Sequence, residues 1–129
     1  MKNNIALYII AGLLMFSQFC NAQTNVIVLE DNTQVQVHDK SSATCRMHRI
    51  IKVINEKGAD AVNFDYQCSK DERISSFSGV VTDQTGRVLR KIKKGDLLMS
   101  EYSHEMATDD YMMYFQYTPP VYPITVTYD

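Results

Sequence analysis

Several features are scarce or absent in this chain of 129 residues. It has no tryptophan, and it contains only five glycines and three prolines, which excludes collagen-like and low-complexity classes. Positive charge is not in excess either, because 13 Lys and Arg face 15 Asp and Glu, for a net charge of −2. A nucleic-acid-binding domain would carry a basic excess, so no nucleic-acid partner is expected. The 45% hydrophobic and 22% charged contents are typical of a chain that folds.

Long hydrophobic runs are also missing, with one exception near the N-terminus. Residues 5–16 are twelve apolar or small residues, preceded by the single charge of Lys2 and followed by a short polar stretch that ends at Ala22. Twelve helical residues span about 18 Å, which is shorter than the ~30 Å hydrocarbon core of a bilayer. This layout is typical of a secretory signal peptide. We therefore predict a signal peptide over 1–22, export to the periplasm or the extracellular space, no stable membrane span, and one folded domain over 23–129.

Cysteine occurs at three positions only. Cys20 lies within the predicted leader, and lipid attachment to it would need a small residue before it, whereas Phe19 stands there. Cys45 and Cys68 remain in the exported part. An even number of cysteines in an exported chain is compatible with a disulfide.

The dominant pattern in the exported part is an alternation of apolar and polar residues with a period of two, which indicates β-strands. Strands are predicted at 25–29, 33–37, 44–54, 61–68, 74–82, 88–92, 111–117 and 124–128. Turn-like residues separate them at spacings near ten residues, whereas 94–110 is less regular. We therefore predict an all-β fold, an antiparallel β-sandwich of about seven strands.

Three short polar segments are predicted to be turns. Asp31-Asn32 would separate the first two strands, and residues 83–86, with Asp first and Gly last, suit a type I turn of a hairpin. Residues 55–58 would join 44–54 to 61–68 in another hairpin.

One register of that last hairpin satisfies two conditions together. It places Ile51 opposite Val62, so that both apolar faces coincide, and it places Cys45 opposite Cys68. Directly opposed strand residues have the separation that a disulfide needs. We therefore predict a cross-strand disulfide between Cys45 and Cys68.

Candidate catalytic and metal-binding residues do not form a recognisable set. Cys45 lies within a predicted strand, and His48 points to the opposite face, so a thiol–imidazole pair is not expected. The remaining candidates are His38, His104 and the acidic Glu101, Glu105, Asp109 and Asp110. None of them has the spacing of a zinc site or a calcium loop. We expect no enzymatic activity, no cofactor and no metal.

Two surfaces are candidates for interaction. Six of the eight tyrosines lie late in the chain. They are Tyr102, Tyr111, Tyr114, Tyr117, Tyr122 and Tyr128. Tyrosine clusters suit protein interfaces and sugar-binding faces, although a core with some tyrosines at its rim is an alternative. Five basic residues lie between positions 87 and 94, where they could protect an edge strand or attract an anionic partner.

A set of motifs resembles a known family. They are 49–58, 74–79, 81–86, 91–97, 109–110 and 122–128, in this order and spacing. Together they resemble a bacterial domain of unknown function that precedes a transglutaminase-like domain in exported proteins. The resemblance covers roughly residues 26–128 and implies an all-β sandwich with a non-catalytic supporting role.

The family pattern continues beyond the motif at 122–128 into more β-structure and a Cys-His-Asp catalytic domain. No residue of that catalytic domain can be carried over to this chain, so we expect a domain truncated at its C-terminal end. Residues 124–128 would then form an exposed, unpaired strand, and the chain is expected to self-associate through residues 111–128. The implied partner is a transglutaminase-like domain; the alternative is a free-standing envelope module that binds a glycan, a peptide or a protein.

Overall fold

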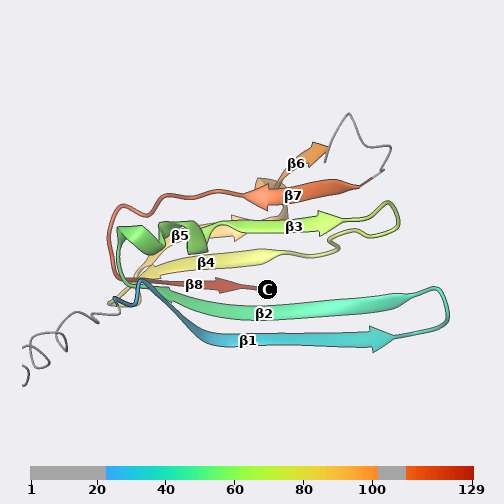
Figure 1. Ribbon diagram of the computed structural model, residues 1–129, viewed down its shortest axis with the longest axis horizontal. Helices are drawn as coiled ribbons and strands as arrows, with labels where there is room; N and C mark the ends of the chain where they lie inside the picture. The colour runs from blue at the N-terminus through green and yellow to red at the C-terminus, as the bar shows by residue number, and fades with distance from the viewer. Residues whose placement is uncertain (1–22, 102–109) are drawn as a thin grey trace, which may run out of the picture.

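A computed structural model describes residues 23–101 and 110–129, so the predicted signal peptide lies outside the described residues. The described chain folds into two antiparallel β-sheets, which confirms the predicted all-β sandwich (Figure 1). The strands are β1 Val26–Val37, β2 Ala43–Val53, β3 Phe64–Cys68, β4 Ser78–Asp83, β5 Val88–Lys93, β6 Leu98–Glu101, β7 Tyr111–Phe115 and β8 Ile124–Tyr128. Two 3₁₀ helices, η2 Glu56–Val62 and η3 Lys94–Asp96, connect them. No helix in these parts is long and apolar enough to cross a membrane.

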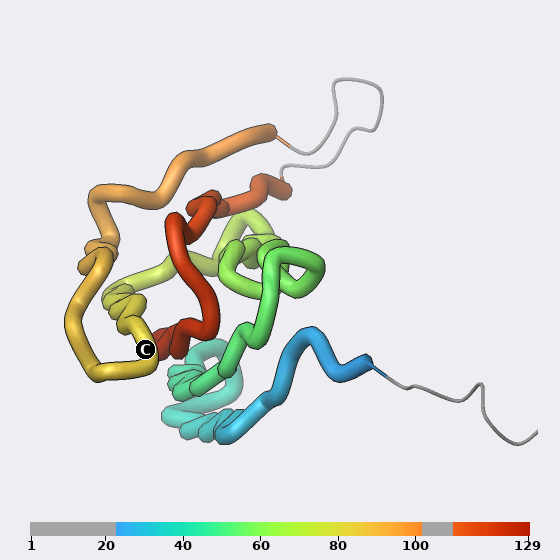
Figure 2. Tube along the Cα trace, turned by 90° about the vertical axis from the view of Figure 1, so that its left-hand side faces the viewer, coloured from blue at the N-terminus to red at the C-terminus, as the bar shows by residue number. Residues whose placement is uncertain are grey.

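The larger sheet has the strand order β1-β2-β8-β4-β5, and the smaller one has the order β3-β7-β6. The last strand of the chain therefore lies in the middle of the larger sheet, where it joins the β1–β2 and β4–β5 hairpins. Figure 2 views the strands nearly end-on and shows the C-terminal segment enclosed between earlier parts of the chain.

This position of β8 corrects the prediction of an exposed C-terminal strand. β8 pairs with β2 along one edge and with β4 along the other. Its alternate residues Ile124, Val126 and Tyr128 are 1%, 0% and 7% exposed and face the core. The alternation of the sequence identified the buried face correctly, but it could not show that two earlier hairpins leave a place for this strand between them.

The predicted turn at Asp31-Asn32 is also wrong, because β1 continues through it. A bulge between Val28 and Glu30 shifts the register, and Asp31 then lies opposite Arg49. The Asp31 carboxylate accepts a hydrogen bond from Arg49 Nη2 at 2.8 Å. The polar pair thus serves cross-strand contacts rather than a turn.

The turn between β1 and β2 lies later, at residues 38–42. The backbone N–H of His38 donates to the carbonyl of Ser42 at 2.9 Å. The Asp39 carboxylate accepts hydrogen bonds from Ser41 N–H and from both serine hydroxyls. These bonds, first of all the one from the Ser41 backbone, lower the pKa of Asp39 to about 2.

The predicted hairpin between 44–54 and 61–68 is also wrong, because the segment between these strands is not a tight turn. Asn55 accepts a hydrogen bond from Lys57 N–H and caps η2, so the segment forms a 3₁₀ helix instead of a tight turn. This helix carries the chain from one sheet to the other, where β3 pairs with β7. Cys45 therefore lies opposite Val35 and Cys68 opposite Tyr111, and both cysteines are free thiols.

The β4–β5 hairpin is confirmed, with strand ends that differ by a few residues from those predicted. Gly86 has φ 85°, which glycine adopts readily. The Asp83 carboxylate accepts hydrogen bonds from the backbone N–H groups of Thr85 and Arg87. β5 is an edge strand, so its basic residues do lie along a sheet edge.

The core lies between the two sheets at the end where β8 is paired. Val53, Val62, Val81, Ile92, Ile124 and Val126 are its most buried aliphatic residues. The rings of Phe64, Phe77 and Tyr128 pack together with centroids 4.5–5.8 Å apart. The Tyr128 hydroxyl donates to the carbonyl of Val62, which links β8 to η2 across the sandwich.

Candidate interaction surfaces

The β1–β2 hairpin is longer than the rest of the larger sheet. β2 pairs with β1 from Ala43 to Val53 but with β8 only from Arg49 to Val53. Residues 32–37 of β1 and 43–48 of β2, together with the turn that joins them, therefore form a two-stranded extension, which we call the outer ribbon. Figure 1 shows it running on past the end of β8.

One face of the outer ribbon is apolar and exposed. Val35 lies opposite Cys45, and Thr33 lies opposite Met47. Cys45 and Met47 share the face of Ile51 on β2, which is buried in the core. We call this the inner face of the ribbon. Its valines, Val35 and Val37, are nevertheless 62% and 72% exposed.

The opposite face of the ribbon is polar. It carries Gln34, Gln36, Thr44, Arg46 and His48. Alternation of this kind is typical of a strand pair that buries one face and leaves the other in solvent. Within the described chain, no strand or helix packs over most of the inner face. An isolated two-stranded hairpin is only marginally stable, so this face favours contact with a further element.

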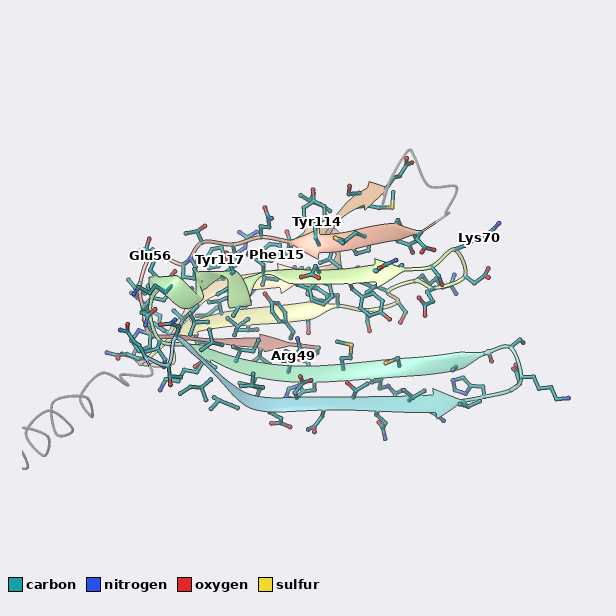
Figure 3. All side chains as sticks on the ribbon, in the orientation of Figure 1. Arg49, Glu56, Lys70, Tyr114, Phe115 and Tyr117 are labelled. Atoms are coloured by element: carbon teal, nitrogen blue, oxygen red, sulfur yellow. The ribbon has the colours of Figure 1, made fainter. Side chains whose placement is uncertain are left out.

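A small charge cluster marks the boundary between the ribbon and the rest of the sheet. His48 Nδ1 lies 2.6 Å from Asp129 Oδ1, and His48 Nε2 lies 3.9 Å from Glu30 Oε2. The hydrogen bond to Asp129 is the main reason that the pKa of His48 is raised above 6.5. Figure 3 labels the neighbouring Arg49, close to the end of β8.

The structure distributes the late tyrosines over several environments. Tyr128 is in the core, and Tyr117 and Tyr122 pack against the core from its rim. Tyr111 donates from its hydroxyl to the Glu72 carbonyl at 2.7 Å. Tyr114 lies on the outer side of the smaller sheet (Figure 3).

Tyr102 lies outside the described residues. The tyrosines that are described do not share one continuous face. Most of them lie in or beside the core, as in the alternative that the sequence left open.

The outer side of the smaller sheet carries an open, shallow hollow around Tyr114. It is lined by Asp60, Asn63, Phe64, Asp65, Ser100, Met112, Tyr114 and Gln116. An aromatic ring beside carboxylates and amides can contact a polar ligand through both stacking and hydrogen bonds. The hollow is therefore a second candidate surface.

Both cysteines face the space between the sheets but in different settings. Cys45 is exposed on the inner face of the ribbon, whereas Cys68 is fully buried at the end of β3. A hydrogen bond between Tyr111 and Cys68 is the main reason that the pKa of Tyr111 is raised. The two thiols thus belong to different sheets rather than to one hairpin.

The other predicted candidates are scattered. His38 Nε2 lies 2.8 Å from Thr44 Oγ1, and Asp110 accepts a hydrogen bond from Gln67. His104, Glu105 and Asp109 lie outside the described residues. Over 23–101 and 110–129, no three His, Cys, Asp or Glu residues are arranged to hold a metal ion.

Comparisons with family models, curated proteins and solved structures found no match to this chain. The resemblance to a domain that precedes transglutaminase-like domains therefore remains a prediction carried by the motifs alone.

The inner face of the outer ribbon is the feature that sequence reasoning missed. The alternation of Val35 and Val37 was visible in the sequence, as was that of Cys45 and Met47. The alternation alone does not identify this face as uncovered, because a sequence does not show where the neighbouring strand of a sheet ends.

Proposed function

We propose that this chain is a non-catalytic, exported β-sandwich module that docks onto another protein domain through the inner face of its outer ribbon. The observation that carries the proposal is the high exposure of Val35 and Val37, which share their face with Cys45 and Met47. Beyond the Asp31–Arg49 ion pair, the same face continues to the buried Ile51. A supporting role of this kind agrees with the resemblance to the domain that precedes transglutaminase-like domains.

The arrangement of the reactive side chains supports a non-catalytic role. A nucleophilic cysteine needs a base beside it, and His48 lies three positions after Cys45 along β2, which is an odd step. They therefore face opposite sides of the sheet. His48 is engaged instead with Asp129 at the strand boundary.

The docking proposal can be tested by site-specific photo-crosslinking in cells that carry the chain naturally. A benzophenone side chain would replace Val35 or Val37 on the inner face and, as matched controls on the same strand, Gln34 or Gln36 on the outer face. We expect the inner positions to crosslink to one partner protein at least fivefold more than the outer positions. The partner, once identified by mass spectrometry and purified, should bind the isolated module.

Binding of the purified partner should then weaken when Val35→Glu is introduced and should persist with Gln34→Glu. Equal crosslinking from the two faces, or no loss of binding with Val35→Glu, would contradict docking through the inner face.

A second candidate function is recognition of a glycan by the hollow around Tyr114. The observation that favours it is the combination of Tyr114 with Asp60, Asp65 and Asn63 in one open hollow. Titration with envelope oligosaccharides, followed by NMR, should shift the backbone amide resonances of Asp65 and Gln116 if this function is correct. These shifts should disappear with Tyr114→Ala and should persist with Tyr111→Phe. An absence of shifts with every oligosaccharide would remove this candidate.

A further inference from the structure

The outer ribbon presents an unpaired backbone edge as well as an apolar face. Within the described chain, residues 43–48 of β2 pair with β1 on one side and with no strand on the other. Alternate N–H and C=O groups of a strand point toward each of its neighbours. About half of the backbone groups of this segment therefore point to the side on which β8 would lie if it were longer. Such an edge is a template for an added strand.

The position of β8 restricts what can add to this edge. β8 occupies one strand position between β2 and β4. On its other side, Asp129 exchanges two backbone hydrogen bonds of 2.9 Å with Ser78. Figure 1 shows that the segment that leads into β4 also runs on past the end of β8. An element that continues the line of β8 is therefore a single strand, which disfavours the two-stranded ribbon of a second copy.

The side chains of β2 define the chemistry of that strand. Continuation of the β2–β8 register would place alternate side chains of the new strand beside Met47 and Cys45, on the inner face. The side chain between them would lie beside Arg46, on the outer face. Arg46 makes no ion pair within the described residues, so an acidic residue at this position would gain a cross-strand partner.

We propose that the edge of β2 from Ala43 to His48 binds one extended strand of a partner protein, antiparallel to β2 and in line with β8. The strand has apolar side chains beside Met47 and Cys45 and an acidic side chain beside Arg46. This inference rests on the proposed docking function and specifies its geometry. The added strand would widen the larger sheet over the ribbon and cover part of its inner face.

The exposed thiol of Cys45 provides a direct test of the register. The probe is the capped peptide Val-Glu-Val-Thr-Val, whose residues would face Met47, Arg46, Cys45, Thr44 and Ala43 in that order. Five versions each carry one cysteine, and each is equilibrated with the full chain in a glutathione redox buffer. Mixed disulfides on Cys45 are then quantified by peptide mass spectrometry. We expect the version with cysteine at the third position to be trapped at least tenfold more than the versions with cysteine at the second or fourth.

The backbone and charge parts of the proposal have their own controls. Saturating peptide should slow amide exchange over 43–48 of β2. Two versions of the peptide, N-methylated on alternate sets of amides, should differ, because only one set points toward β2. Arg46→Glu should reduce trapping of the Glu peptide about fivefold, and a peptide with Lys in place of Glu should restore it.

The two proposals fail in different ways. Equal trapping of all five versions, together with unchanged exchange over 43–48, would overturn strand addition. If the crosslinks from Val35 and Val37 persist in that case, docking through the inner face still stands. If those crosslinks are absent as well, both proposals fall.

Discussion

His48 illustrates how a single side chain joins the last strand to the long hairpin. It lies where the outer ribbon meets the part of β2 that also pairs with β8. It contacts Asp129, which directly follows β8, and Glu30 on β1. A sequence in which positions 30, 48 and 129 are so far apart does not reveal this cluster. The polar Asp31-Asn32 pair was misinterpreted as a turn for the same reason, since its cross-strand partner Arg49 was not known.

The cluster makes stability depend on pH. Because the fold raises the pKa of His48, it favours the protonated imidazole. The resulting stabilisation is fully present below the unfolded-state value near 6.5 and is lost as the pH rises through the folded-state pKa. NMR titration of the His48 ring should give a midpoint above 6.5, which Asp129→Asn should lower.

Glu30→Gln is the matched comparison for that titration. Its carboxylate lies farther away, at 3.9 Å compared with 2.6 Å for Asp129, and should affect the midpoint less. A midpoint at or below 6.5 in the unsubstituted chain would contradict the hydrogen bond to Asp129.

The hydroxyl group of Tyr128 is expected to contribute to the free energy of unfolding. Burial raises its pKa to about 12, and its hydroxyl donates to the carbonyl of Val62. Tyr128→Phe keeps the ring contacts but leaves a buried carbonyl without this donor, so we expect a loss of about 1–3 kcal/mol of unfolding free energy. Tyr114→Phe, on the outer side of the smaller sheet, should change it by less than about 0.5 kcal/mol. Urea titration of both variants gives the comparison, and equal effects would contradict the assignment of Tyr128 to the core.

At the scale of elements, local segments were predicted better than distant pairings. The β4–β5 hairpin was correct because its strands and its turn are contiguous in the sequence. The segment after β2 was wrong because four polar residues that suit a turn also suit a capped 3₁₀ helix. Whether the segment forms a turn or a helix depends on whether β2 pairs with β3 or with β8, and β8 lies at the far end of the chain.

The helix η2 depends on a close approach at Gly58. A Cβ atom at this position would lie 2.6 Å from the carbonyl oxygen of Asn25 and 2.6 Å from Val26 Cγ2. Gly58→Ala should therefore destabilise the fold by about 1–3 kcal/mol, because the backbone of residue 25 would have to move. The expected result is a lower midpoint of urea unfolding.

Gly95 in η3 is the matched control, because no atom lies within 4 Å of a Cβ built there. Gly95→Ala should leave the midpoint unchanged or raise it slightly. If the two alanine variants behave alike, the tight contact between η2 and the start of β1 is not present in solution.

At the scale of the whole molecule, the fold has two unequal parts. In the closed part, β8 is paired on both edges and its apolar face is buried against the second sheet. In the outer ribbon, each strand pairs only with the other, and the valines are exposed. The fold class followed from periodicity, but this division could not, because it depends on the relative lengths of strands that are distant in the sequence.

The division predicts a gradient of amide-exchange protection within the single strand β2. Local opening free energies range from near zero at frayed edges up to the global value in the core. Residues 49–53 lie between two strands, whereas 43–48 have one neighbour, so we expect the amides of the outer segment to exchange roughly a hundredfold faster. Amide exchange followed by NMR on the free module measures this ratio residue by residue.

The edge strand β5 separates two explanations for such a gradient. It also has one neighbour, β4, but its Ile92 is 1% exposed and packs in the core. If the cover of the inner face controls protection, β5 should be protected more than the outer segment of β2. If β5 exchanges as fast as that segment, edge position alone is responsible. Uniform protection along β2 would instead mean that the ribbon is already covered in the free protein, and the inner face would then not be available to a partner domain.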